Sequence, residues 1–544
     1  MHCALYRGGE WAGTYSRARA VSREENTLAV PSPPSPSPSL SSLPIPSSDP
    51  PAFHALLLRH TEAILPYVYT PTVGEACQRY HALPGLTPTG IYLTPADAAT
   101  PGAVAAKLRS YRPPGSSSPS TPPCIVIVTD GARILGLGDL GAGGLGIAEG
   151  KALLYTAAGG VPPTALVPVC LDVGTDNASL LADPAYRGLR AKRAPAEVLD
   201  ALVGALFAAV REWRPRAALI HFEDFASASA FRLLARYGGG AAGLPAFNDD
   251  IEGTASVALA AILAGLRLTG GDLAAQRLLF FGAGEAGAGI GELVAAALVS
   301  RCGLPLAAAR ARCVFVDSSG LVTSRRPGPL AAHKAPFAHD LPFVRTLADA
   351  VALVRPTVLV GVSAVAGAFS PAVLGAMADL NGRPIILPLS NPTHLAECSL
   401  AQALEGTGGR GIVATGSPFP PHAGRAASQA NNAYIFPGVG LAALVTRASR
   451  LGPGAFLAAA ECLALQATAE EQEAGLLFPR FSRVADASAA VAAAVAAHLI
   501  ASGDGMPPEG AAYAAMGGRA VGATALEAYV RGRMVNLAGG PPRL

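Results

Sequence analysis

Short apolar runs that alternate with longer, helix-like segments are the feature that most constrains the fold of this chain. The runs are rich in Val, Ile, Leu and Phe, a composition typical of strands that are covered on both faces of a sheet. They span residues 124–128, 165–171, 217–222, 278–281, 313–316, 358–360, 385–389 and 412–414. Strands that alternate with helices predict an α/β fold built largely on parallel sheet.

Nearly every run ends in a polar or glycine-rich loop. Glu223 and Asp224 follow the run 217–222, and the polar residues 390–393 follow the run 385–389. Ligands of open α/β sheets bind outside the carboxyl ends of the strands. These loops are therefore where we expect the functional groups.

One strand–loop–helix segment predicts a dinucleotide site. The run 278–281 leads directly into Gly282, Gly284 and Gly287, which fit the pattern G-x-G-x-x-G and precede a helix-compatible stretch. In this context a pyrophosphate would lie on a helix N-terminus, whereas the alternative is a purely structural tight turn. Asp317 ends the next run and is the candidate ribose ligand, although its spacing exceeds the usual ~20 residues.

A second match to the same glycine pattern, at residues 136–141, is weaker evidence because it stands alone. Further glycines continue it to Lys151, and they would let the backbone approach a small ligand closely. Arg133 and Lys151 are the only cations between residues 113 and 186. Without a functional role, Arg133 would form a surface ion pair, and Lys151 would lie at a solvated helix start.

Adjacent acidic residues stand out because Asp, Glu, Lys and Arg make up only 15% of the chain. Asp249 and Asp250 come just before an apolar, helix-like run at 254–263, for which Thr254 is the expected N-cap. Carboxylates at a strand end and at a helix start can converge on one hard cation, so this pair and the acidic pair at 223–224 predict a metal site.

The composition bounds the functional classes. A net charge of +3 gives no basic surplus that would indicate nucleic-acid binding. Apolar stretches are short or broken by Gly and Pro, so we expect no membrane span. The eight cysteines show no metal-ligand spacing, and we interpret them as reduced, mostly buried thiols of an intracellular protein.

Residues 1–50 are predicted to be a disordered, low-complexity or targeting segment, because eight prolines and eight serines lie within residues 31–50. An organelle transit peptide and an ordinary tail both remain open. Helical spacing of apolar residues begins at Phe53.

In these motifs the chain resembles malic enzymes, the oxidative decarboxylases of malate. The similarity covers roughly residues 53–500. The matching stretches are residues 69–77, 128–141, 172–177, 222–225, 247–254, 282–287, 389–393 and 429–438.

The resemblance implies roles for individual side chains. Glu223, Asp224 and Asp250 match the ligands of Mg²⁺ or Mn²⁺, which would stabilise the enolate that forms as CO₂ leaves. Lys151 matches the general base for the C2 hydroxyl of malate, and Asp249 matches its partner. The general acid that protonates C3 corresponds to Tyr69. The substrate ligands correspond to Arg133, Asn391 and Asn432.

For the cofactor, the resemblance implies a nicotinamide dinucleotide bound by Gly282, Gly284, Glu285, Ala286, Gly287, Asp317, Ser318, Lys334 and Asn391. Ser318 after the strand-end acid, with Lys334 further along the loop, favours NADP, and NAD stays open. The alternative for Lys334 is a solvated loop lysine.

The resemblance also implies the domain order. A substrate and metal domain at 51–253, with a short helical N-terminal part, precedes a Rossmann-type domain at 254–440. Helices at 441–502 should pack back on the substrate domain, and 503–544 form a tail. We expect a homo-oligomer (dimer or tetramer), with malate and pyruvate as small-molecule partners, in the cytoplasm, a plastid or a mitochondrion.

The chain departs from the family pattern before Tyr69, where a Pro/Ser tract replaces helical sequence that helps to build the oligomer interface, and Glu149 adds a carboxylate near the proposed base. Alternatives to an NADP-dependent malic enzyme are therefore an NAD-dependent or malolactic-type activity and a catalytically impaired interaction subunit.

Overall fold

The computed structural model describes residues 72–83, 87–114, 116, 124–214, 218–507 and 523–534, together with Phe53, Leu57, Thr61, Ile64, Val68 and Tyr69. The predicted segment 1–50 lies outside these residues. The chain divides into two units, residues 1–226 with 534–544 and residues 227–533.

The first unit is built on parallel strands. β1 (Ile91–Leu93), β2 (Cys124–Thr129), β3 (Leu166–Leu171) and β4 (Ala218–Phe222) pair in the order β1-β3-β2-β4. Every residue of β2, β3 and β4 is buried, as expected for continuous apolar strands covered on both faces. The predicted strands therefore form, and β1, which is only three residues long, was not predicted.

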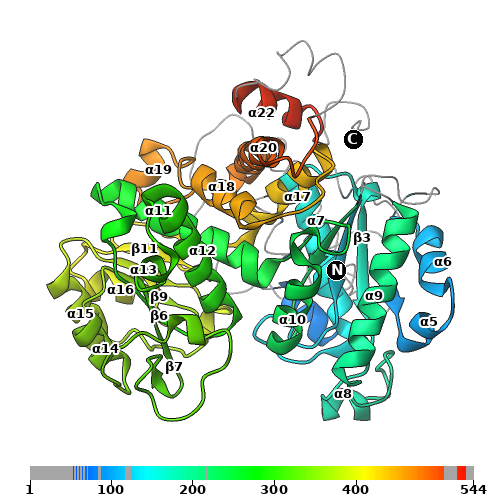
Figure 1. Ribbon diagram of the computed structural model, residues 1–544, viewed down its shortest axis with the longest axis horizontal. Helices are drawn as coiled ribbons and strands as arrows, with labels where there is room; N and C mark the ends of the chain where they lie inside the picture. The colour runs from blue at the N-terminus through cyan, green and yellow to red at the C-terminus, as the bar shows by residue number, and fades with distance from the viewer. Residues whose placement is uncertain are drawn as a thin grey trace, which may run out of the picture. The chain divides into compact units, whose positions relative to one another are not determined.

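Helices cover this sheet. α7 (Leu145–Gly159) packs against β2 and β3. α9 (Ala196–Trp213) packs against α5 (Pro95–Ala99) and α6 (Ala103–Ser110), and the three lie together in Figure 1. α8 (Ala178–Ala182) follows β3, and α4 (Thr72–Gln78) contacts α7.

The second unit contains a seven-stranded sheet in the order β12-β11-β10-β9-β6-β7-β8, parallel except at the β7–β8 hairpin. Its strands are β6 (Leu278–Phe281), β7 (Cys313–Asp317), β8 (Gly320–Leu321), β9 (Val358–Gly361), β10 (Ile385–Pro388), β11 (Ile412–Thr415) and β12 (Ser428–Gln429). Successive strands run outward from β6 through β7 to β8 on one side, and from β9 through β10 and β11 to β12 on the other. The β6–β9 boundary is thus the point where ligands bind in open α/β sheets.

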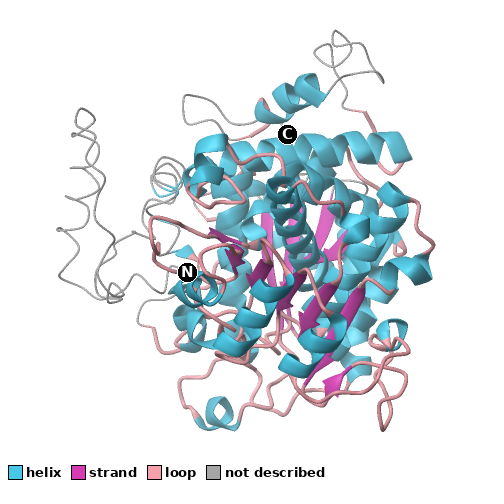
Figure 2. Ribbon diagram, turned by 90° about the vertical axis from the view of Figure 1, so that its left-hand side faces the viewer, coloured by secondary structure: helices cyan, strands magenta, loops and turns pink. Residues whose placement is uncertain are grey.

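This sheet is covered on both faces, which confirms the predicted Rossmann-type α/β architecture. α14 (Leu347–Val354), α15 (Pro371–Leu380) and α16 (Leu400–Gly406) lie together along one side in Figure 1, and their apolar residues share a core with Leu279, Leu359 and Ile386. α11 (Thr254–Thr269), α12 (Glu285–Cys302) and α13 (Leu306–Arg310) pack on one another and contact the sheet through β7 and β10. Figure 2 shows the strands enclosed by helices.

The C-terminal part of the second unit is helical, and the packing of residues 441–502 on the substrate domain stays a prediction. α17 (Phe436–Val445), α18 (Pro453–Leu463) and α20 (Val484–Ser502) pack on one another, and α22 (Ala523–Arg531) lies on α20 (Figure 1). α18 also packs against α11. The short α19 (Ala469–Glu473) precedes α20.

Two stretches of helix in the described part of the chain are long and apolar enough to cross a membrane by length and composition. They span Asp249–Thr269 and Phe481–Ser502. Their most apolar windows are 78% and 56% buried within the structure, as in the core helices of water-soluble folds. We therefore interpret both as packed helices.

Candidate active site

A buried ion pair lies at the carboxyl end of β4. Lys151 Nζ lies 3.0 Å from Glu223 Oε1, and each side chain is only 2% exposed. Glu223 directly follows β4, and its backbone N–H donates to the carbonyl of Val128 at the end of β2. The two strand ends thus hold the carboxylate against a lysine of α7.

Lys151 lies within α7 rather than at its start. Lys151 is the seventh residue of this helix, because α7 already begins at Leu145. Glycines in the turn 141–144 and at Gly146 allow the close packing of this part of the chain against its neighbours. Burial of Lys151 excludes the solvated alternative.

The glycine run 136–141 is part of a hydrogen-bonded loop that precedes the turn 141–144 and α7. The N–H of Ile134 donates to the carbonyl of Gly138, and the N–H of Leu140 donates to that of Gly131. Arg133 is exposed on this loop. The loop is tied to the acidic pair because Asp224 Oδ2 accepts a hydrogen bond from the N–H of Leu135 at 3.0 Å.

Tyr69 is buried beside the lysine. Its ring centroid lies 5.7 Å from Lys151 Nζ, and the residue is 7% exposed. Glu149, the carboxylate that the sequence adds near the base, accepts hydrogen bonds from Tyr80 and from both the N–H and the hydroxyl of Thr89. Within the first unit, Tyr69 and Glu223 therefore both lie beside Lys151. Glu149 is instead engaged by Tyr80 and Thr89.

Two further polar residues continue the buried network, and the sequence analysis predicted a role for neither of them. His221 Nε2 lies 2.9 Å from Glu223 Oε2, and Tyr155 Oη lies 2.9 Å from His221 Nδ1. The available signal was a histidine in an otherwise apolar strand and a tyrosine four residues after Lys151 on the same helix.

In the second unit, the segment Asp249–Gly253, which contains three acidic residues, forms a π-helical turn that leads into α11. Asn248 has extended backbone angles, and its side chain accepts from the N–H of Ile251 at 3.0 Å. The prediction of Thr254 as N-cap is wrong, because the chain enters helical geometry at Asp249 and Asn248 caps it.

Asp249 and Asn432 are paired within this unit. Asn432 Nδ2 donates to Asp249 Oδ2 at 3.0 Å, and Thr254 Oγ1 lies 3.1 Å from the same nitrogen. A Cβ on Gly253 would lie 1.9 Å from Asp249 Oδ1, so only glycine leaves room for this carboxylate. Asp250 is half-buried on the same turn.

The loop after β6 has the geometry of a dinucleotide fingerprint. Gly282 has φ +117°, and a Cβ there would lie 2.4 Å from the carbonyl of Val362, which follows β9. A Cβ on Gly287 would lie 2.2 Å from the carbonyl of Gly282. Glu285 and Ala286 begin α12, so the loop leads directly into a helix N-terminus.

Asp317 ends β7 and is held by two cations. Arg326 Nη1 lies 2.8 Å from Oδ2 and 2.9 Å from Oδ1, and Lys334 Nζ lies 2.7 Å from Oδ2. Burial alone would raise the pKa of Asp317, but the hydrogen bonds from Arg326 and Lys334 outweigh it and hold the pKa below its usual value. Ser318 is exposed in the β7–β8 turn. The sequence reading missed Arg326.

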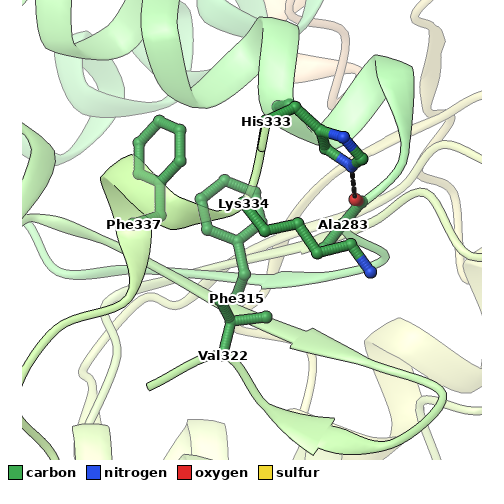
Figure 3. A pocket seen from close by; sticks show the side chains of 7 residues that line it. Ala283, Phe315, Val322, His333, Lys334 and Phe337 are labelled. Carbon is green, nitrogen blue, oxygen red and sulfur yellow. Dashed lines mark hydrogen bonds between the residues drawn. The ribbon is translucent and has the colours of Figure 1, made fainter. Parts of the chain in front are cut away.

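Lys334 and His333 lie beside a small pocket next to the glycine loop (Figure 3). His333 Nε2 donates to the carbonyl of Ala283 at 3.0 Å, and its ring stacks on Phe231. The contact ties the lysine-bearing loop to the turn between β6 and α12.

Asn391 follows β10 and is exposed, with its amide oriented by a neighbour. Ser417 Oγ donates to Asn391 Oδ1 at 2.8 Å. The buried Glu397 accepts from the hydroxyl groups of Ser363 and Ser390, which joins the loops after β9 and β10. Nδ2 of Asn391 is thus the group that can donate to a ligand.

The predicted metal ligands and Asp249 all offer carboxylate oxygens. Glu223 and Asp224 lie in the first unit, and Asp249 and Asp250 in the second. Oxygen-only donors suit Mg²⁺ or Mn²⁺ and not the softer metals that prefer thiolates. Among the described residues, no cysteine of the seven is in a disulfide, and five of the seven are buried, in line with the predicted mostly buried thiols.

Two family models match the chain. The model described as "Malic enzyme, N-terminal domain" matches residues 50–238, and that described as "Malic enzyme, NAD binding domain" matches residues 251–500.

Curated relatives and solved structures agree. A chloroplastic NADP-dependent malic enzyme of Zea mays is 46% identical over 448 residues, which are 82% of this chain and 68% of that protein. An NADP-dependent malic enzyme of Vitis vinifera is 45% identical over 449 residues, 82% of this chain and 74% of that protein. The crystal structure of Entamoeba histolytica malic enzyme has the same fold, with a TM-score of 0.57, 21% identity, and coverage of 95% of this chain and 85% of that chain.

Proposed function

Because the chain belongs to the malic enzyme family, we propose that it converts (S)-malate to pyruvate and CO₂ while reducing NADP, with the help of a divalent cation. The observation that carries the proposal is the buried Lys151–Glu223 pair at the carboxyl end of β4. Burying two charges costs free energy, so a buried ion pair is best explained by a role in a functional site.

In the proposed reaction, Lys151 takes the proton of the C2 hydroxyl, and a bound nicotinamide would accept the hydride from C2. The C3–C4 bond of the resulting oxaloacetate then breaks, CO₂ leaves, and Tyr69 donates a proton to C3 of the enol to give pyruvate. A divalent cation held by Glu223, Asp224 and Asp250 would supply positive charge for the enolate oxygen.

A base must be neutral before it can accept a proton. The negative charge of Glu223 stabilises the ammonium form of Lys151. When Glu223 also binds a divalent cation, this stabilisation is weaker, and the neutral amine is favoured. We propose that Asp249 assists Lys151, and its pairing with Asn432 supports a fixed orientation for this carboxylate.

Substrate carboxylates need donors. The exposed Arg133 guanidinium can bind a carboxylate through two parallel hydrogen bonds. Asn391 has its Oδ1 occupied by Ser417, which supports Nδ2 as a donor to malate or to the cofactor. Asn432 would add a further amide beside Asp249.

NADP is favoured over NAD by the charge around Asp317. In NAD sites an acid at this place accepts hydrogen bonds from the ribose 2′-hydroxyl. Here Arg326 and Lys334 occupy both oxygens of Asp317 and leave one positive charge in excess. That excess, with the hydroxyl of Ser318, suits a 2′-phosphate.

A cofactor-resolved assay tests the reaction. Reduced NADP should form only when malate and Mn²⁺ or Mg²⁺ are both present, and NAD should support a slower rate, as followed by absorbance of the reduced cofactor. Malate consumption without release of reduced cofactor would indicate malolactic-type turnover instead. A chain that binds neither Mn²⁺ nor NADP would indicate an impaired interaction subunit.

The cofactor preference can be tested separately. Lys334→Gln should raise the KM for NADP about 10-fold to 100-fold, the equivalent of one charged hydrogen bond, with little change in the KM for NAD. Arg325→Gln is the matched control, because Arg325 pairs with Asp340 and not with Asp317. Equal changes for both cofactors would contradict the assignment of Lys334.

We further propose the domain order stated above, with boundaries at 51–253, 254–440, 441–502 and 503–544, and assembly into a homo-oligomer. Limited proteolysis with mass spectrometry would test the boundaries, and light scattering after size-exclusion chromatography would test the assembly. The compartment is proposed as plastid, cytoplasm or mitochondrion, and a fluorescent fusion would distinguish these.

A further inference from the structure

A chain of buried hydrogen bonds runs from α7 through β4 to the Lys151 pair. Tyr155 contacts His221, His221 contacts Glu223, and Glu223 contacts Lys151, with distances of 2.9, 2.9 and 3.0 Å. Tyr155 and His221 are both 0% exposed. Polar groups this deep destabilise a fold unless their hydrogen bonds are satisfied.

The partners determine the direction of each hydrogen bond. A carboxylate only accepts, so His221 Nε2 carries the hydrogen that it shares with Glu223 Oε2. His221 Nδ1 then accepts from the hydroxyl of Tyr155. We assign this tautomer from the partners, and it satisfies both ring nitrogens with a neutral imidazole.

The two oxygens of Glu223 consequently face different partners. Oε2 accepts from His221 and Oε1 pairs with Lys151, so the carboxylate cannot rotate without breaking one of the contacts. A carboxylate oxygen has two lone pairs, so it can accept a hydrogen bond and bind a cation at the same time. Hydrogen bonds to the back of a ligand often fix its orientation and raise its affinity for a metal.

We propose that Tyr155 and His221 are a positioning pair that orients the Glu223 carboxylate toward a divalent cation while it remains paired with Lys151. The proposal rests on the proposed function only in that Glu223 is a metal ligand. A role in packing alone would predict that the pair affects stability and not cation affinity.

The test measures Mn²⁺ binding to the full chain, without substrate, by the electron paramagnetic resonance signal of free Mn²⁺. His221→Leu should raise the Kd for Mn²⁺ about 10-fold to 100-fold. Tyr155→Phe, which keeps the ring, should raise it about 2-fold to 10-fold, as for one neutral hydrogen bond. His221→Gln restores a donor and should recover part of the affinity.

Thr156→Val is the matched control. Thr156 is buried on the same helix and donates to the carbonyl of Val161, so the change removes a buried hydrogen bond away from Glu223. Its Kd for Mn²⁺ should equal that of the wild-type chain, and the Kd for NADP should be unchanged in all variants. Thermal unfolding in EDTA measures the loss of stability of each variant.

Two outcomes separate this inference from the proposed function. If the wild-type chain binds Mn²⁺ and Tyr155→Phe and His221→Leu bind it equally well, the positioning role is wrong and the proposed function stands. If the wild-type chain binds no Mn²⁺, the metal-dependent function fails and the positioning role fails with it.

Discussion

Replacing Lys151 with alanine should lower kcat for malate oxidation by about 100-fold to 10,000-fold, the usual contribution of a general base. Its amine is the buried basic group at the end of β4, 3.0 Å from Glu223. The Kd for NADP, measured by fluorescence titration, should stay unchanged because the glycine loop that would bind the cofactor lies elsewhere in the chain, at residues 282–287.

Two further variants distinguish a base from a structural cation. Lys151→Arg keeps the positive charge but cannot lose it, so it should be as inactive as the alanine variant. Lys107→Ala removes a lysine that pairs with Asp97 in the same unit and should leave kcat unchanged. Turnover retained by Lys151→Ala or by Lys151→Arg would refute the base assignment.

Sequence patterns predicted the fold because its main determinants are local. Runs such as 124–128 and 278–281 are apolar at every position, and the structure buries them in parallel sheets. The glycines at 282 and 287 are recognisable because their neighbours leave no room for a Cβ. Short strands such as β1, β8 and β12 carry too few residues for a pattern.

Partners of site residues were harder to predict because they come from distant parts of the chain. Arg326 was missed because its contact with Asp317 requires the loop after β8 to fold back. His221 and Tyr155 were not predicted because their role depends on a contact between a strand and a helix that are far apart in the sequence. The cap at Asn248 was missed because a π-helical turn has no simple sequence period.

Replacing Glu223 with leucine should lower the free energy of unfolding by about 3–5 kcal/mol, because Lys151 would lose its counter-charge in a site where both side chains are only 2% exposed. Urea unfolding in EDTA, followed by tryptophan fluorescence, measures the loss without any contribution from bound metal. The result does not depend on catalytic activity.

The double variant Lys151→Met with Glu223→Leu tests the reason for that loss. Removing both charges leaves an apolar pair of similar size, so most of the lost stability should return. If the double variant is as unstable as Glu223→Leu alone, packing and not the charge of Lys151 explains the loss. Recovery would mean that the ion pair itself adds little to stability, and that its retention is better explained by the chemistry of Lys151 and Glu223 than by folding.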